Sequence, residues 1–207
     1  MTVSVVAWSK PIEARPNTAL VVALHGRGAD ERSMAGLTPF LPAGVTIAAP
    51  RGPIDVGNGF AWFANRGIGR PIEESIKAVG QELFAWLDAV AAIHSKIFLL
   101  GFSGGTAMAG GLLLAAPLRF AGSILLSGTM PWDAGYDTSA DRLSGCKVFW
   151  GNDHEDEVIP ADLVARSERW LADESGADLV ERHYRGLGHS ISPAELADVA
   201  TFISAAL

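Results

Sequence analysis

Short apolar and β-branched runs alternate along the chain with longer segments in which apolar residues recur every three or four positions. This alternation is typical of an α/β domain with a largely parallel sheet. Several short runs are apolar at nearly every position, which indicates interior strands with helices covering both faces of the sheet. The expected strands are residues 3–8, 19–24, 45–49, 96–100, 122–126, 147–150 and 179–184.

The clearest predicted helix covers residues 72–93. Its apolar residues fall three or four positions apart, and charged residues such as Glu82 occupy the other faces. This pattern predicts an amphipathic helix that packs one face on the sheet. Further helices are expected after Ser103, over residues 161–172 and after Ser192.

The last predicted helix has the best-defined start in the chain. Ser192 suits the N-cap, Pro193 suits the first helical position, and Glu195 follows three residues after the cap. Together they form the pattern of a capping box, in which the serine and glutamate side chains each satisfy a free backbone amide.

Composition narrows the class of protein. The 207 residues, of which 49% are hydrophobic and 19% charged, predict a single domain over residues 1–207 with a sizeable core. A net charge of −7 without a basic run argues against a nucleic acid partner and against attraction to anionic lipids. Cys146 is the single cysteine, which excludes an intrachain disulfide and a thiolate zinc cluster. We expect a cytoplasmic protein without a stable membrane anchor.

A candidate nucleophile follows the apolar strand that ends at Leu100. The sequence Gly101-Phe102-Ser103-Gly104-Gly105 is a G-x-S-x-G pattern between a strand and a predicted helix. In that setting the glycines leave room for a tight turn that exposes the serine hydroxyl. The turn would place Ser103 at the carboxyl end of a central strand, where open α/β sheets bind ligands.

A serine hydroxyl needs a general base, and histidine is the side chain whose proton affinity suits neutral pH. Of the five histidines, His189 stands in a glycine-rich loop after the last predicted strand and before the Ser192 cap. That loop belongs to the same edge of the sheet as Ser103, so His189 is the candidate base. For the other four histidines a structural role is the favoured interpretation.

The imidazole in turn needs a carboxylate partner. The segment after the 147–150 strand offers Asp153, Glu155, Asp156 and Glu157, and their spacing from the strand does not decide between them. His154 lies among these acids, but no paired-histidine spacing typical of a metal site accompanies it. We therefore expect no metal.

Glycines also follow the second predicted strand, in Leu24-His25-Gly26-Arg27-Gly28. Small residues there let a backbone amide point into the cleft, as acyl-transfer chemistry requires for its oxyanion. A dinucleotide-binding loop is excluded because Glu31 stands where the third glycine would be, and we expect no organic cofactor.

Four segments in the same order, LHGRGADE, GFSGGTAMA, DEVIP and GLGHSIS, resemble the compact α/β-hydrolases of the carboxylesterase, lysophospholipase and acyl-protein thioesterase family. The resemblance implies an α/β-hydrolase fold with about seven mostly parallel strands and no large cap domain. Since the family's catalytic aspartate lies four residues before a proline, Pro160 favours Asp156 over Asp153. The family's oxyanion donors correspond to the amides of Arg27 and Gly104.

The resemblance further implies that Trp62, Phe63, Met130 and Trp132 border the acyl or alcohol pocket. For the three aromatic residues, Trp62, Phe63 and Trp132, burial in the core is the alternative interpretation. One departure from the family is Gly104, where glutamine is usual, so a side chain that helps to frame the pocket is missing. Homodimerisation is compatible with the resemblance.

The residues together predict hydrolysis of a small-molecule carboxylic ester or thioester by Ser103, His189 and Asp156. Two alternatives stay open. The same three residues can serve a lactonase, perhydrolase or lyase, and the chain can be a non-catalytic binding module that kept the cleft.

Overall fold

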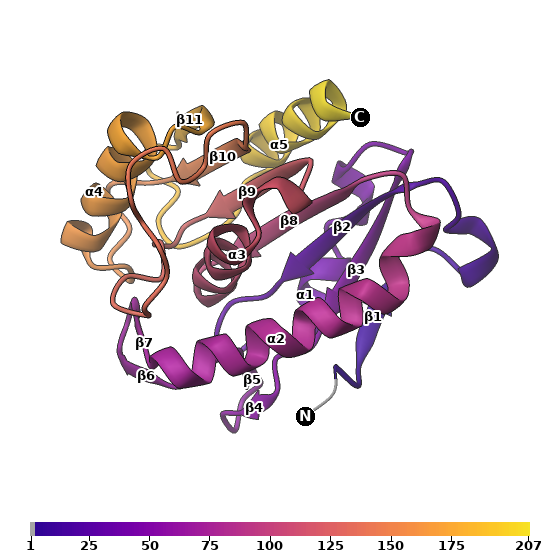
Figure 1. Ribbon diagram of the computed structural model, residues 1–207, viewed down its shortest axis with the longest axis horizontal. Coiled ribbons are helices and arrows are strands. Elements are labelled where there is room, and N and C mark those ends of the chain that lie inside the picture. The colour runs from indigo at the N-terminus through magenta and orange to yellow at the C-terminus, as the bar shows by residue number, and fades with distance from the viewer. Residues whose placement is uncertain (1–2) are drawn as a thin grey trace.

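The computed structural model describes residues 3–207 and centres on a seven-stranded sheet with the strand order β1-β3-β2-β8-β9-β10-β11 (Figure 1). Strand β1 pairs with β3 in antiparallel fashion, and the remaining neighbours are parallel. The strands are β1 (Val6–Trp8), β2 (Ala19–Leu24), β3 (Val45–Pro50), β8 (Ile97–Phe102), β9 (Gly122–Leu126), β10 (Lys147–Asn152) and β11 (Asp178–His183).

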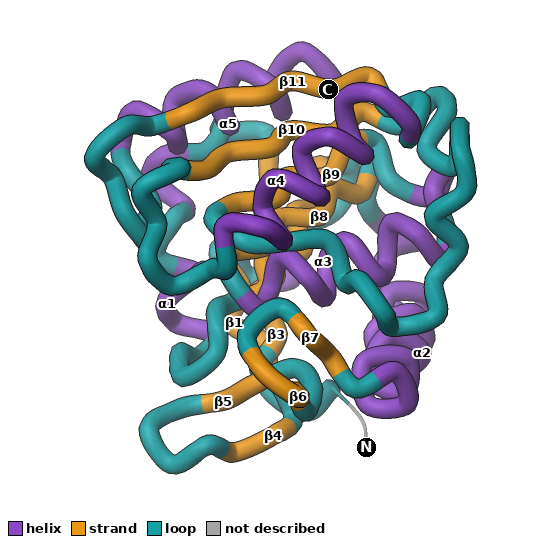
Figure 2. The backbone as a smooth tube through the Cα atoms, turned by 90° about the vertical axis from the view of Figure 1, so that its left-hand side faces the viewer, coloured by secondary structure: helices purple, strands orange, loops and turns teal. Residues whose placement is uncertain are grey.

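Five α-helices cover the two faces of the sheet. Figure 2 views the sheet from one end, with α1 and α5 to the left of the strands and α2 and α3 to the right. They are α1 (Glu31–Ala35), α2 (Glu73–Val90), α3 (Gly104–Ala115), α4 (Ala161–Arg169) and α5 (Pro193–Ala206). The predicted α/β architecture is confirmed.

Alternate residues of each interior strand feed two separate cores. Leu20 and Val22 of β2 pack in the core that α2, α3 and α4 cover, and Val21 and Ala23 pack in the core under α1 and α5. Since both sets of side chains are fully buried, every position of β2 is apolar. This double burial explains the continuous apolar runs in the sequence.

Two strands are longer than their apolar runs predict. β8 continues to Phe102, which pairs with Leu126 of β9, and β10 continues to Asn152, which pairs with His183 of β11. Pairing to a neighbouring strand holds these residues extended although Gly101, Gly151 and Asn152 are of types that strands disfavour. Each extension brings the chain up to the turn or loop that carries candidate site residues.

The irregular residues 50–71 fold into two small two-stranded sheets. They are β4 (Ile54–Asp55) with β5 (Phe60–Ala61), and β6 (Asn65–Gly67) with β7 (Arg70–Pro71). The β5 strand also reaches the loop after β2, since the Gly28 amide donates to the Phe60 carbonyl at 2.9 Å. This long connection therefore supports the glycine loop that follows β2.

In the described part of the chain, no helix combines the length and the apolar character needed to cross a membrane.

The predicted capping box at α5 has regular hydrogen-bond geometry on its serine side. The Ser192 hydroxyl accepts a hydrogen bond from the Glu195 amide at 3.1 Å, as expected of an N-cap. The Glu195 carboxylate is fully buried beside Gly151 and faces the Ser192 backbone amide, without a hydrogen bond of regular geometry between them. Burial raises the pKa of Glu195 to about 7.

Glu195 should make the stability of the protein depend on pH. Because its folded-state pKa exceeds the ordinary value of 4.5, the folded protein binds more protons between these values. The free energy of unfolding should therefore fall as pH rises from about 4.5 to about 7, by on the order of 3 kcal/mol. Glu195→Gln should remove this loss, so urea unfolding at pH 8 should find the variant more stable than the wild type.

At pH 5 the two proteins should differ much less, since the wild-type carboxyl is then mostly protonated. An equal difference at pH 5 and pH 8 would contradict a raised pKa of Glu195 in the folded protein.

Candidate active site

Ser103 stands on a strained turn between β8 and α3. Its φ of 57° and ψ of −117° lie in a region that non-glycine residues rarely adopt. The turn is held in place by a hydrogen bond from the Ser103 amide to the Leu126 carbonyl of β9, at 3.0 Å. The Ser103 hydroxyl consequently projects from the carboxyl edge of the sheet.

The glycines on either side of Ser103 are required by close backbone contacts. A Cβ on Gly101 would lie within 3.0 Å of the Gly105 carbonyl group, and a Cβ on Gly105 would lie within 3.0 Å of the Leu24 carbonyl group of β2. Since both obstacles are backbone, neither can move aside easily. The G-x-S-x-G pattern therefore lets α3 begin directly against β2 and β8.

Three side chains from distant parts of the sequence meet at this turn. His189 Nε2 lies 2.9 Å from the Ser103 hydroxyl oxygen, and His189 Nδ1 lies 2.8 Å from Asp156 Oδ2. The His189 side chain is 20% exposed and the Asp156 side chain 4% exposed, so the acid is shielded from water. Phe102 lies against the imidazole, with 5.0 Å between ring centroids. This arrangement can activate the hydroxyl as a nucleophile.

Two aspartates of the loop after β10 hold different parts of the histidine loop. Asp156 contacts the imidazole, and its other oxygen accepts the Val158 amide at 2.8 Å. Asp153 instead accepts the Gly188 amide at 2.8 Å, next to His189, and the Glu155 amide at 3.0 Å. These backbone hydrogen bonds, with the one from Glu155 as the largest cause, lower the pKa of Asp153.

The sequence did not reveal this second role for an acid. A signal was nevertheless present, because Gly186 and Gly188 both adopt positive φ, which turns the loop so that its amides face Asp153. Two glycines just before the histidine mark a turn of this kind in the sequence. In the structure, Asp153 accepts a hydrogen bond from one of the amides of that turn.

The backbone amides of Arg27 and Gly104, the two expected oxyanion donors, lie close to each other next to Ser103. Gly104 is the first residue of α3, so its amide has no acceptor within the helix. A Cβ built on Gly104 would lie 3.5 Å from the Arg27 amide nitrogen, an ordinary contact that puts the two residues side by side. A Cβ would fit at position 104, so glycine leaves space next to Arg27.

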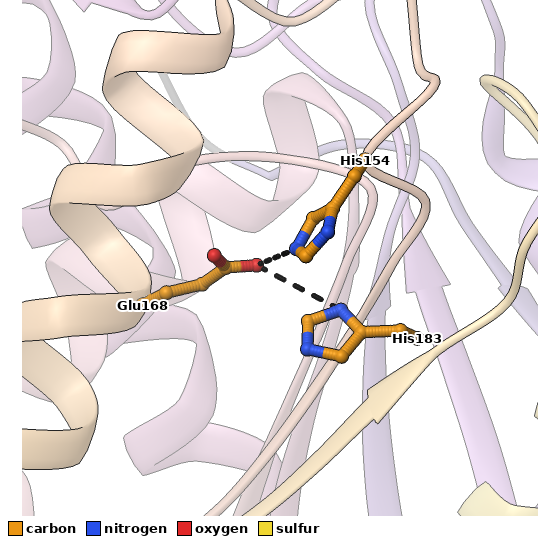
Figure 3. Close-up of side chains that lie close together, drawn as sticks. All are labelled: His154, Glu168 and His183. Carbon is orange, nitrogen blue, oxygen red and sulfur yellow. Dashed lines mark hydrogen bonds and ion pairs between the residues drawn. The ribbon is translucent and has the colours of Figure 1, made fainter.

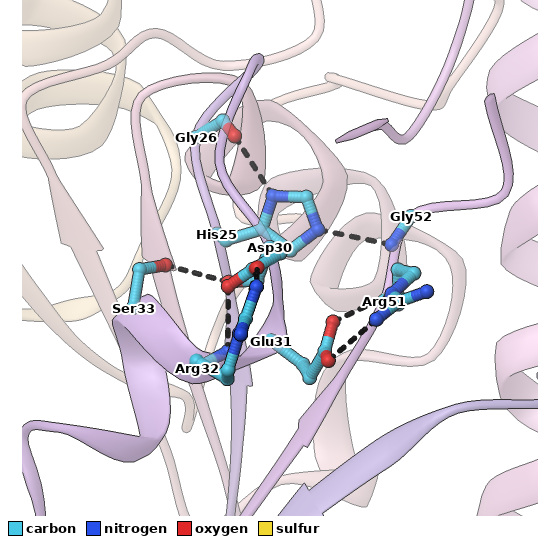
Figure 4. Close-up of polar contacts among 8 residues, drawn as sticks. All are labelled: His25, Gly26, Asp30, Glu31, Arg32, Ser33, Arg51 and Gly52. Atoms are coloured by element: carbon cyan, nitrogen blue, oxygen red, sulfur yellow. Dashed lines mark hydrogen bonds and ion pairs between the residues drawn. The ribbon is translucent and has the colours of Figure 1, made fainter. Parts of the chain in front are cut away.

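A buried histidine holds the loop that contains Arg27. The His25 ring accepts the Gly52 amide at Nε2, at 3.0 Å, so Nδ1 carries the proton and donates to the Gly26 carbonyl at 2.8 Å (Figure 4). Burial lowers the pKa of His25, which keeps this neutral form. The Glu31–Arg51 ion pair lies beside it in the same view.

The four residues expected to border the pocket lie in the core. Trp62, Phe63, Met130 and Trp132 are each at most 5% exposed. The Trp62 indole donates to the His25 carbonyl at 2.8 Å, and the Trp132 indole donates to the Ser167 hydroxyl at 3.0 Å. Their burial supports the alternative of core packing, and contact of these four residues with a substrate stays a prediction.

Side chains with metal-ligating atoms converge beside the loop that carries Asp156. They are His154, Glu168 and His183.

Comparisons with known proteins agree on one family. The profile of the phospholipase/carboxylesterase family matches residues 11–207. Acyl-protein thioesterase 1 of Eremothecium gossypii is 29% identical over 94% of this chain and 90% of its own length. Carboxylesterase SOBER1 of Arabidopsis thaliana is 27% identical over 75% of this chain and 73% of its own length.

Solved structures show the same fold. The crystal structure of the Bacillus cereus carboxylesterase matches with a TM-score of 0.81 at 19% identity, over 98% of this chain and 94% of that chain. The crystal structure of Arabidopsis thaliana SOBER1 matches with a TM-score of 0.77 at 22% identity, over 92% of this chain and 99% of that chain. The expected α/β-hydrolase fold is confirmed.

The backbone contact at Gly105 should make that position intolerant of a side chain. Gly105→Ala should lower the free energy of unfolding by about 3 kcal/mol or more, because its Cβ would meet the Leu24 carbonyl group. Gly104→Ala is the matched control, since its Cβ would make only ordinary contacts. Urea unfolding should find the control within about 1 kcal/mol of the wild type. Equal stability of the two variants would show that the turn can relax.

Proposed function

This chain belongs to the phospholipase/carboxylesterase family, and from that premise we propose that it is a serine hydrolase that cleaves a carboxylic ester or thioester through an acyl-enzyme. The observation that carries the proposal is the continuous hydrogen-bonded chain from the Ser103 hydroxyl through His189 to Asp156. The names of its relatives, a thioesterase and a carboxylesterase, support the two substrate classes.

Catalysis begins with the Ser103 oxygen attacking the substrate carbonyl carbon. His189 takes the hydroxyl proton at Nε2, the atom that lies 2.9 Å from the serine oxygen. The ring then carries a positive charge, which Asp156 stabilises from the Nδ1 side. Because the Asp156 side chain is nearly inaccessible to water, this attraction is only weakly screened.

The attack places a negative charge on the former carbonyl oxygen. The amides of Arg27 and Gly104 are the proposed donors to that oxyanion, and their fixed backbone positions need no rearrangement during the reaction. His189 next gives its proton to the leaving alcohol or thiol, which leaves an acyl group on Ser103. Water, activated by the same imidazole, then hydrolyses the acyl-enzyme and releases the acid.

Ser103→Ala should lower kcat/KM for a short p-nitrophenyl ester by about 10³-fold or more, since binding and oxyanion stabilisation alone would remain. A fluorophosphonate probe should label the wild type and leave this variant unlabelled. Ser204→Ala, at an exposed serine of α5, is the control and should keep both activity and labelling. Undiminished turnover by Ser103→Ala would remove this serine from the mechanism.

The two aspartates should differ sharply in their effect on turnover. Asp156→Asn removes the charge that stabilises the imidazolium and should lower kcat by about 10³- to 10⁴-fold. Asp153→Asn keeps an oxygen that can accept the Gly188 amide, so its main effect should be on stability. Steady-state kinetics and thermal melts of both variants test this. Similar kinetic losses in the two variants, or a greater loss in Asp153→Asn, would overturn the assignment of the acid.

A further inference from the structure

Two histidines and a glutamate from three separate elements meet at the outer side of the acid loop. His154 belongs to the loop after β10, Glu168 to α4, and His183 to the end of β11 (Figure 3). His154 Nε2 lies 3.1 Å from Glu168 Oε1, and His183 Nδ1 lies 3.9 Å from the same oxygen. All three ligand atoms fall within 4.8 Å of one another.

These distances suit a shared metal ion. Ligand atoms about 2.0–2.2 Å from a tetrahedral ion are about 3.3–3.6 Å apart, which lies between the two distances to Glu168. Both imidazoles turn a ring nitrogen toward Glu168 in Figure 3, with 4.2 Å between the ring centroids. Small side-chain rotations would bring all three atoms to bonding distance.

The surroundings orient the ligands as metal sites require. The Asn152 amide donates to Glu168 Oε1 at 2.6 Å and the Trp150 indole nitrogen lies 3.4 Å from it, which fixes the carboxylate. His183 Nδ1 also lies 2.9 Å from Asn152 Oδ1, a hydrogen bond that a bound ion would replace, and on the far side of the ring Nε2 lies 3.5 Å from the Glu181 carboxylate. A carboxylate on the far nitrogen of a ligating histidine sets its tautomer and raises its basicity.

Glu168 Oε1 is crowded with hydrogen-bond donors. Its lone pairs face Asn152, Trp150 and the nearer nitrogen of His154. An oxygen with two lone pairs cannot satisfy so many N–H groups equally well. A cation bound to His154 Nε2 removes one of these donors, and the charges of Glu168 and Glu181 balance a divalent ion.

We propose that His154, Glu168 and His183 bind a divalent transition-metal ion of the zinc type. Two imidazoles and one carboxylate favour such an ion, whereas Mg²⁺ and Ca²⁺ prefer oxygen ligands. Both histidines are exposed, so the ion can enter from solvent. The bound ion links α4 and β11 to the loop in which Asp153 and Asp156 hold the histidine loop, and it should therefore stabilise this region.

The test uses tag-free protein stripped of metal with a chelator. Calorimetric titration with Zn²⁺ should give one ion per chain, and Zn²⁺ should raise the melting temperature, whereas Mg²⁺ and Ca²⁺ should not. Co²⁺ should add visible absorption bands typical of nitrogen and oxygen ligands. His154→Gln and His183→Gln should each lower the Zn²⁺ affinity at least about tenfold, and Glu181→Gln should lower it by about tenfold.

Two variants serve as controls and should keep the affinity for Zn²⁺. Glu155→Gln changes an exposed acid of the same loop whose nearest cation is Arg185, at 3.6 Å. His189→Gln removes the histidine that faces Ser103, the other place where zinc could bind. Absence of saturable Zn²⁺ binding by the wild type would overturn the proposal. So would binding that His189→Gln abolishes, or binding that neither His154→Gln nor His183→Gln weakens.

Discussion

The site depends on one close approach of backbones, where the start of α3 meets β8 and β2. Without side chains at Gly101 and Gly105, the chain can reverse within the few residues around Ser103. A serine at such a φ costs of order 1–3 kcal/mol, and the fully buried residues that α3 packs against the sheet offset this cost. The same turn leaves the Gly104 amide free of an intrahelical acceptor. The tight turn that the glycines permit therefore both exposes the Ser103 hydroxyl and leaves the Gly104 amide available.

The loop after β10 concentrates most of the polar chemistry around this turn. Within four residues, Asp153 holds the backbone next to His189, His154 faces Glu168, and Asp156 contacts the imidazole. This concentration follows from the parallel sheet, because the carboxyl ends of its strands all open on one edge. Each of these side chains acts on a different neighbour, so neighbouring positions in sequence serve separate purposes.

The loop that carries Arg27, the proposed oxyanion donor, is supported by buried and uncharged groups instead. A neutral His25 joins the loop of Arg27 to the segment after β3, and Trp62 secures the His25 carbonyl. Desolvation keeps the ring neutral, which avoids a buried positive charge without a close partner. The long connection over residues 50–71 thus contributes to the site through backbone support and through side chains within the core.

Local patterns in the sequence were sufficient to predict the sheet and the helices, and they singled out Ser103 and His189, whose side chains lie within hydrogen-bond distance in the structure. Each of these depends on residues adjacent in the chain: apolar runs for strands, periodic apolar positions for helices, and glycines around the serine and before the histidine. The same patterns left four acids open, and only resemblance favoured Asp156. Tertiary structure decided that Asp153 anchors Gly188, that Trp62 and Trp132 are buried, and that Glu168 and His183 meet His154. Those outcomes depend on loop paths and helix packing, which bring together residues that no local spacing relates.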